Sequence, residues 1–137
     1  MDYLAVGLAG FLGAVTRAVL GKLIKFEFAG QLPVNTLVIN LTGCLVLSFF
    51  MRITVERLVI NPRLRVAIST GFLGAYTTFS AFALETTNLI RGGSISVALA
   101  YAMATSFGCV LLSWAGVALS RLITETDKSR NDTSSED

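Results

Sequence analysis

Long runs without a charged residue dominate the chain. Uncharged stretches extend from Phe28 to Met51, from Val66 to Leu84 and from Gly92 to Ser120. Each exceeds the roughly 18 residues that mark a candidate membrane-spanning helix. A fourth run, from Tyr3 to about Ile24, is interrupted by Arg17 but is long enough to cross a hydrocarbon core of about 30 Å. The pattern predicts an all-α membrane protein with four transmembrane helices.

Cap and turn residues set the ends of these helices. Pro33 suits a first helical turn, where its missing N–H costs nothing, and Asn61 is a helix cap followed by proline. Gly92-Gly93 marks a turn before the last helix. We therefore expect one transmembrane domain over residues 1–123, with helices at about 3–25, 33–52, 62–90 and 94–123, and a polar, disordered tail over residues 124–137.

Basic residues near the helix ends give only a weak orientation signal. Four spans place both chain ends on one side of the membrane, and that side has five basic residues near helix ends against three on the other. A chain with so small a bias can insert both ways round. No internal repeat is visible, so an antiparallel homodimer is favoured as the way to build a symmetric pathway. The five are Arg52, Arg57, Arg63, Arg65 and Arg121, and the three are Lys22, Lys25 and Arg91.

Composition argues against several classes of function. A net charge of +2 is too small to indicate a nucleic-acid partner. The chain has no histidine, which removes the usual general base and the commonest metal ligand. Cys44 and Cys109 are interpreted as small buried hydrophobes without the pattern of a zinc site or disulfide framework. We do not expect an enzyme, because no nucleophile–base pair is present.

The second predicted helix carries an amide at membrane depth. Thr36, Asn40 and Gly43 are spaced four and three residues apart, so they share one helical face. A buried amide costs free energy unless it is hydrogen-bonded. The sequence leaves two interpretations of Asn40 open: an interhelical hydrogen bond, or a donor that faces a polar path.

Residues 71–82 form a poor helix interior inside the third span. The segment GFLGAYTTFSAF contains two glycines, two threonines and a serine. A helix broken in mid-membrane is tolerated where its free backbone groups are buried or line a polar site. Such breaks can present carbonyls to ions. We predict a broken helix here; the alternative is a kinked helix whose Ser and Thr hydroxyls bond back to the preceding turn.

This segment resembles the signature GxxGxxTTFSTF of the Fluc (CrcB) family of fluoride channels. The run around Asn40 and Gly43 resembles that family's asparagine motif, and residues 13–17 resemble its Gly-Ala-x-x-Arg element. The resemblance covers all four predicted helices. The chain departs from the signature at Ala81, where the family has threonine, and has Ala75-Tyr76 where small or aliphatic residues are usual. The first departure removes one hydroxyl from the expected track.

The resemblance implies a dual-topology, antiparallel homodimer in the cell (inner) membrane, with two pores that export fluoride passively. It also implies one structural Na⁺ at the dimer centre, bound by the backbone carbonyls of Gly74 and Thr77. The pore residues that it implies are Asn40 as an amide donor, Phe79 and Phe82 as the two box phenylalanines, Tyr101 as their associated hydroxyl, and Thr105, Thr36 and Ser80 as an extension of the polar track.

The chemistry of fluoride is consistent with these residue types. Fluoride holds its water tightly, so a pore must offer substitute donors. Amide and hydroxyl groups provide them, and the positive edges of phenylalanine rings add weak attraction. A fixed cation beside the anion would trap it, whereas conduction requires several weak sites. The motif contains no charged residue.

Two charged residues within the spans have competing interpretations. Arg17 either snorkels or bonds helix-end carbonyls, or it forms a vestibule that attracts anions. We favour a helix-end or interfacial position for Glu85 over a proton relay. The main alternative function is a small dual-topology, proton-coupled multidrug exporter, which needs a carboxylate in the membrane, and Glu85 is the only internal candidate. A third alternative is a non-transporting assembly subunit, which would carry neither fluoride flux nor proton-coupled drug flux.

Overall fold

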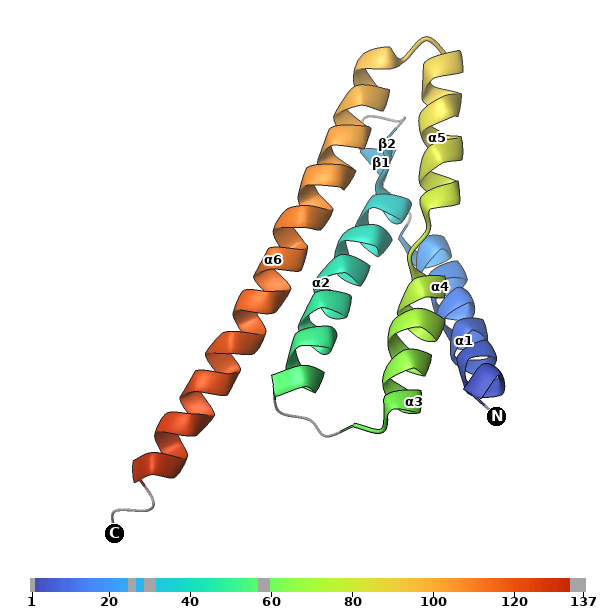
Figure 1. The fold of residues 1–137 in the computed structure, drawn as a ribbon. Coiled ribbons are helices and arrows are strands. Elements are labelled where there is room, and N and C mark those ends of the chain that lie inside the picture. Colours follow the sequence, from blue (N-terminus) through green and yellow to red (C-terminus); the bar gives the residue numbers. More distant parts are fainter. Residues whose placement is uncertain (1, 25–26, 29–31, 57–59, 134–137) are drawn as a thin grey trace.

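The computed structural model describes residues 2–24, 27–28, 32–56 and 60–133 of the chain. These residues are helical apart from one small hairpin and short connections (Figure 1). The strands β1 (Glu27–Phe28) and β2 (Leu32–Pro33) pair antiparallel. The helices are α1 (Asp2–Leu23), α2 (Val34–Glu56), α3 (Pro62–Val66), the π-helical segment η1 (Ala67–Leu73), α4 (Gly74–Tyr76), α5 (Phe79–Arg91) and α6 (Ile95–Thr133).

Four helical segments of the described chain are long and apolar enough to cross a membrane. They are Tyr3–Leu23, Val34–Glu56, Pro62–Arg91 and Ile95–Thr124. At most 28% of the most apolar window of each is buried within the chain. Apolar surface on this scale is stable against lipid but not against water. The prediction of a multi-pass membrane protein with four spanning helices is confirmed.

The observed helix ends differ from the predicted ones mainly at the C-terminal side. Helix α2 begins at Val34, directly after Pro33, and Lys25, the predicted end of the first helix, lies outside the described residues. The tail was predicted to be disordered from residue 124, but helical backbone continues to Thr133. Glu, Lys and Arg have good helix propensity, so a polar sequence can prolong a helix beyond its apolar span. Residues 134–137 lie outside the described part.

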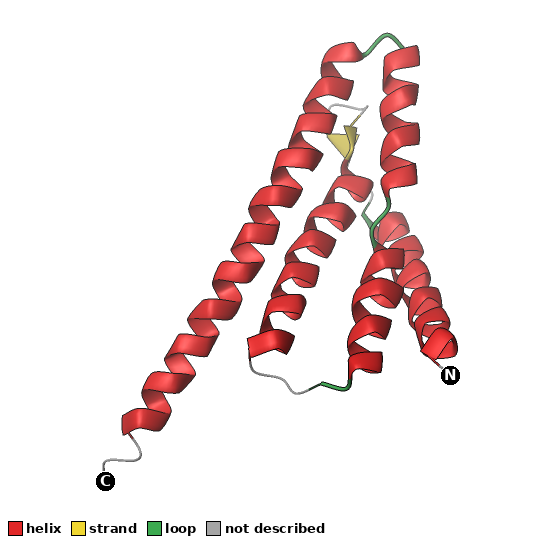
Figure 2. Cartoon of the chain, viewed as in Figure 1, coloured by secondary structure: helices red, strands yellow, loops and turns green. Residues whose placement is uncertain are grey.

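The helices are arranged so that the beginning of α1 and the end of α6 lie at the same end of the molecule (Figure 1). The end of α2 and the beginning of α3 are also at that end, whereas the strands β1 and β2 and the turn between α5 and α6 are toward the opposite end (Figure 2). Helix α2 packs mainly on α6, and α1 packs mainly on η1 and α4. This arrangement brings α2, the α4–α5 connection and α6 together.

Glycines allow the backbones of α1 and η1 to approach closely. A Cβ atom built on Gly71 would lie 2.7 Å from the Val6 carbonyl oxygen, and one built on Gly13 would overlap the carbonyl of Phe72. Small residues promote this kind of contact between membrane helices. The π-helical segment η1 lies at this contact, and π-helical turns occur frequently beside functional sites.

Candidate functional site

Asn40 holds the connection between α4 and α5. Two residues of extended backbone, Thr77 and Thr78, separate these helices. The Thr78 N–H donates to Asn40 Oδ1 at 2.8 Å, and Asn40 Nδ2 donates to the Thr78 carbonyl at 3.0 Å. Asn40 is only 8% exposed. Its amide therefore supplies the partners that Thr78 would otherwise lack at a buried position.

Two hydrogen bonds at this connection leave two backbone carbonyls without their helical donors. In a continuous α-helix, the Thr78 N–H would donate to the Gly74 carbonyl and the Ala81 N–H to the Thr77 carbonyl. Here the Thr78 N–H donates to Asn40, and the Ala81 N–H donates to Thr78 Oγ1 at 3.2 Å. The Gly74 and Thr77 carbonyls thus lose their helical donors. Uncharged carbonyl oxygens suit a hard monovalent cation such as Na⁺, so this chain's residues fit the implied ion.

A cavity of about 310 Å³ lies beside this connection. We call it the Asn40 cavity. Helices α2, α5 and α6 contribute predicted pore residues to its lining, and none of the described residues that line it is charged. The predicted residues that it brings together are Asn40, Phe79, Phe82 and Thr105, with Thr77 and Thr78 beside them.

Two neutral donors remain available in the Asn40 cavity. The Thr105 hydroxyl is buried and has no hydrogen-bond partner within the described ranges. An asparagine amide carries two N–H donors, and the bond to Thr78 uses one of them. A buried donor without a partner costs free energy. The cavity is therefore equipped to bind a small anion by hydrogen bonds alone.

Aromatic rings extend from this cavity along α5 to α6. The ring centroids of Phe79 and Phe82 are 5.7 Å apart at an interplanar angle of 50°, and those of Phe82 and Tyr101 are 5.2 Å apart at 52°. Tilted rings direct positively polarised edges toward neighbouring groups. Phe79 is 79% exposed, although it lines the cavity.

Glu85 accepts hydrogen bonds from two of the predicted track residues. Thr36 Oγ1 donates to Glu85 Oε1 and the Tyr101 hydroxyl donates to Glu85 Oε2, both at 2.7 Å. Thr36 and Tyr101 are buried. Sequence analysis favoured a helix-end or interfacial position for Glu85. It lies in the middle of α5, and an interfacial depth in the membrane stays a prediction. Its partners are 49 and 16 residues away along the chain, so no local pattern indicated them.

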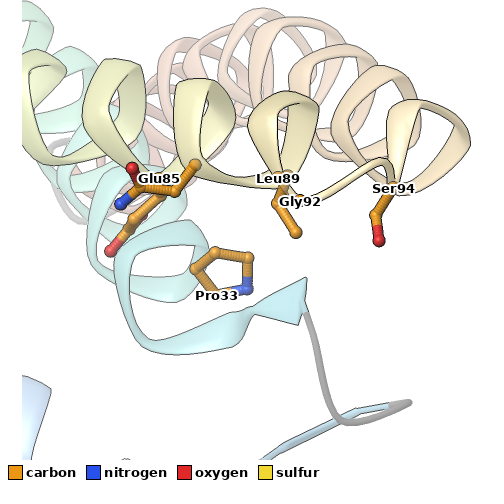
Figure 3. A pocket seen from close by; sticks show the side chains of 6 residues that line it. Pro33, Glu85, Leu89, Gly92 and Ser94 are labelled. Carbon is orange, nitrogen blue, oxygen red and sulfur yellow. The ribbon is translucent and has the colours of Figure 1, made fainter.

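Glu85 also lines a second cavity, of about 340 Å³, near the turn between α5 and α6 (Figure 3). We call it the Glu85 pocket, and it includes Pro33 and Ser94. Tyr101 connects the two cavities, because its ring contacts Phe82 and its hydroxyl donates to Glu85. A series of polar and aromatic side chains therefore extends from the Asn40 cavity to the Glu85 pocket.

The predicted site residues that do not line the Asn40 cavity are Gly74, Thr36 and Tyr101, described above, together with Ser80 and Arg17. The Ser80 hydroxyl is hydrogen-bonded to the Thr78 hydroxyl at 3.2 Å and does not contribute to the cavity lining. Arg17 lies in α1, and no described side chain pairs with it.

Sequence reasoning gave no site role to several residues around this cavity. Gly43 was expected to share a face with Asn40 and to belong to the family's asparagine motif, without a role of its own, yet a Cβ there would overlap the Thr77 methyl group. Cys44 and Cys109, interpreted as buried hydrophobes, line the cavity. A glycine three residues after a buried amide was the available signal for close packing, and no signal placed the two thiols together.

Comparison with known proteins shows the family of the chain. The sequence model of the family described as "CrcB-like protein, Camphor Resistance (CrcB)" matches residues 4–117. The chain is 46% identical to "Fluoride-specific ion channel FluC 1" of Moorella thermoacetica, covering 88% of this chain and 84% of that protein. It is 43% identical to "Fluoride-specific ion channel FluC 2" of Geobacillus kaustophilus, with 86% and 92% covered. The predicted resemblance is confirmed, and the chain belongs to the CrcB family.

Proposed function

We propose that this protein is a fluoride-selective channel that exports fluoride across the cell (inner) membrane by passive conduction. Its named relatives are fluoride-specific ion channels. The observation that carries the proposal is the Asn40 cavity, which offers amide, hydroxyl and aromatic groups without a charged residue in its described lining. Such groups replace part of the hydration of a small anion without trapping it.

The pathway extends from the Asn40 cavity past the phenylalanine rings to Tyr101. Thr105 and Asn40 donate to the anion in the cavity, and the edges of Phe79 and Phe82 line its passage. Thr36 and Ser80 extend the polar track beyond the cavity. Arg17, which pairs with no described side chain, contributes positive potential at a vestibule.

The working unit is an antiparallel homodimer with two pores. Phe79 supports this part of the proposal, because a cavity-lining aromatic that is 79% exposed in the single chain needs a covering surface. The interruption between α4 and α5 lies near the middle of the candidate span Pro62–Arg91, and lipid around that span could not satisfy its carbonyls. A second copy facing the opposite way supplies cover for both features. A C-terminal tag found on only one side of the membrane would contradict the arrangement.

One Na⁺ at the dimer centre completes the structure. The Gly74 and Thr77 carbonyls support this assignment, since Asn40 and Thr78 take away their helical donors. Two carbonyls from each copy provide an uncharged oxygen site. When bound, the ion supplies positive potential near the pathway without standing in it.

Fluoride efflux from proteoliposomes tests the function. Liposomes loaded with potassium fluoride and carrying the purified protein are expected to release fluoride when an ionophore carries the counterion. Chloride-loaded liposomes serve as the selectivity control. Equal efflux of both anions, or none of fluoride, would overturn the proposal.

The same assay separates a channel from a proton-coupled exporter. An exporter needs a carboxylate that exchanges protons with substrate, and both Glu85 oxygens are already hydrogen-bonded by Thr36 and Tyr101. Fluoride efflux that persists after a protonophore removes the proton gradient supports the channel. Efflux that stops would favour the exporter.

A further inference from the structure

Two thiols share the wall of the Asn40 cavity. Cys44 comes from α2 and Cys109 from α6, and both line this cavity. Both are free and only partly buried. The two side chains come from neighbouring helices and border the same cavity of about 310 Å³. Residues far apart in the sequence thus form a dithiol that the proposed conduction does not use.

Close helix packing brings these thiols together. On α6, Gly108 and Gly116 lie on either side of Cys109 along the chain. A Cβ built on Gly108 would lie 2.6 Å from a Leu41 methyl group, and one built on Gly116 would lie 2.5 Å from the Leu45 carbonyl oxygen. Helices α2 and α6 therefore approach each other closely at Gly108 and again at Gly116. Cys44 and Cys109 lie along this same contact between the two helices.

We propose that Cys44 and Cys109 form a binding site for a soft, thiol-seeking metal cation that bridges α2 and α6 at the Asn40 cavity. Thiolate sulfur is the protein ligand that soft cations prefer. Two sulfurs on neighbouring helices suit an ion with low coordination number. The neutral cavity of about 310 Å³ gives the ion space beside them.

The binding step balances without an oxidant. With mercuric chloride as the probe, each thiol loses its proton and forms one sulfur–mercury bond. Two chlorides leave the metal, and the protons and chlorides together are released as two equivalents of HCl. The sulfurs and the metal keep their oxidation states. A bridged ion also fixes α2 to α6 and occupies space at the side of the anion path.

Metal binding to the purified, full-length protein tests the site without reference to transport. The chain has two cysteines, so every thiol signal reports on Cys44 or Cys109. We expect one Hg²⁺ per chain by mass spectrometry, with both titratable thiols lost together. Two mercury ions per chain, each on its own thiol, would overturn the bridge.

Single variants measure how far the two sulfurs cooperate. The second sulfur of a bridged pair acts at a high effective concentration. Stripping Hg²⁺ from the parent with glutathione should therefore require at least about tenfold more competitor than stripping it from Cys44→Ala or Cys109→Ala. The matching serine variants repeat the measurement if an alanine variant folds poorly. Equal competitor concentrations for parent and variants would contradict the proposal.

The consequence for transport rests on the proposed channel function. Fluoride efflux of each protein is measured with and without Hg²⁺ and is divided by its own untreated rate. We expect a loss of most efflux in the parent and little relative change in the double variant. Equal inhibition of both would show that the thiol pair is not the inhibitory site. An untreated parent that carries no fluoride would refute the channel, whereas the binding measurement would still decide the metal site.

Discussion

Replacing Asn40 with aspartate separates two roles of its side chain, which are to hold Thr78 in place and to donate a hydrogen bond to an anion in the cavity. The substitution keeps the shape and leaves an oxygen that can accept the Thr78 N–H. It removes both N–H donors, of which one bonds the Thr78 carbonyl and the other is available to the cavity. We expect Asn40→Asp to retain most of the fold and to lose conduction.

The magnitudes follow from these contacts. Losing a donor to an anion costs about 1.5–3 kcal/mol. An ionised carboxylate about 4 Å from fluoride adds a repulsion of about 4 kcal/mol at an effective dielectric constant of about 20. Since about 1.4 kcal/mol in a barrier is a factor of ten, the two terms together should lower the flux by about four orders of magnitude. One unpaired Thr78 carbonyl costs about 1–3 kcal/mol of folding stability.

Efflux from proteoliposomes measures the flux, and size-exclusion yield with thermal unfolding measures the fold. Asn35→Asp is the matched control, because it makes the same change on α2 outside the residues that line the Asn40 cavity. Its flux should fall far less. If Asn40→Asp folds like the parent and conducts at the parental rate, Asn40 only supports packing, and the cavity is not the pathway.

Four further substitutions, at three places in the site, test its other parts. Replacing Phe79 or Phe82 with isoleucine keeps apolar bulk but removes the ring edge, so efflux should fall sharply while thermal stability changes little; stable variants with parental efflux would mean the rings are packing only. Gly43→Ala places a methyl group against Thr77 and should lower the stability of the fold by about 1–3 kcal/mol. Gly7→Ala is the control and should not, because nothing lies within 4 Å of the added methyl group. Equal melting temperatures of Gly43→Ala and the parent would refute the close contact. Thr105→Val removes a buried hydroxyl without a described partner, so the melting temperature should hold or rise while efflux falls; unchanged efflux would exclude this donor.

The sequence predicted the spans and most of the cavity because both depend on local patterns. Uncharged runs gave the four helices, since lipid requires apolar surface along a whole span. The poor helix interior in residues 71–82 and the spacing around Asn40 indicated two of the segments that meet in the Asn40 cavity. Resemblance to one family supplied the individual pore residues, including Phe79, Phe82, Tyr101 and Thr105, which periodicity alone would not have separated from packing residues.

Other features depend on contacts between distant segments. Glu85 receives hydrogen bonds from α2 and α6, so its role depends on where three helices meet. The π-helical geometry of η1 accompanies the close contact of Gly71 with α1. The continuation of α6 to Thr133 was missed because a polar segment is compatible with both a helix and a disordered tail.

Asn40 links the anion path to the proposed sodium site through the two ends of its amide. Oδ1 takes the Thr78 N–H away from the Gly74 carbonyl, while Nδ2 lies at the cavity. Without this side chain, as in Asn40→Ala, the Thr78 N–H can return to the Gly74 carbonyl as in a continuous helix. We therefore expect that variant to lose its response to sodium as well as its flux.

Thermal unfolding in sodium and in N-methylglucamine buffers measures that response. The parent should melt at a lower temperature without sodium, because a ligand that binds only the folded state stabilises it. Asn40→Asp keeps the acceptor for Thr78 and should keep the shift, whereas Asn40→Ala should lose it. A full sodium shift in Asn40→Ala would show that the amide does not control the carbonyl, and that the cation site and the anion path are independent.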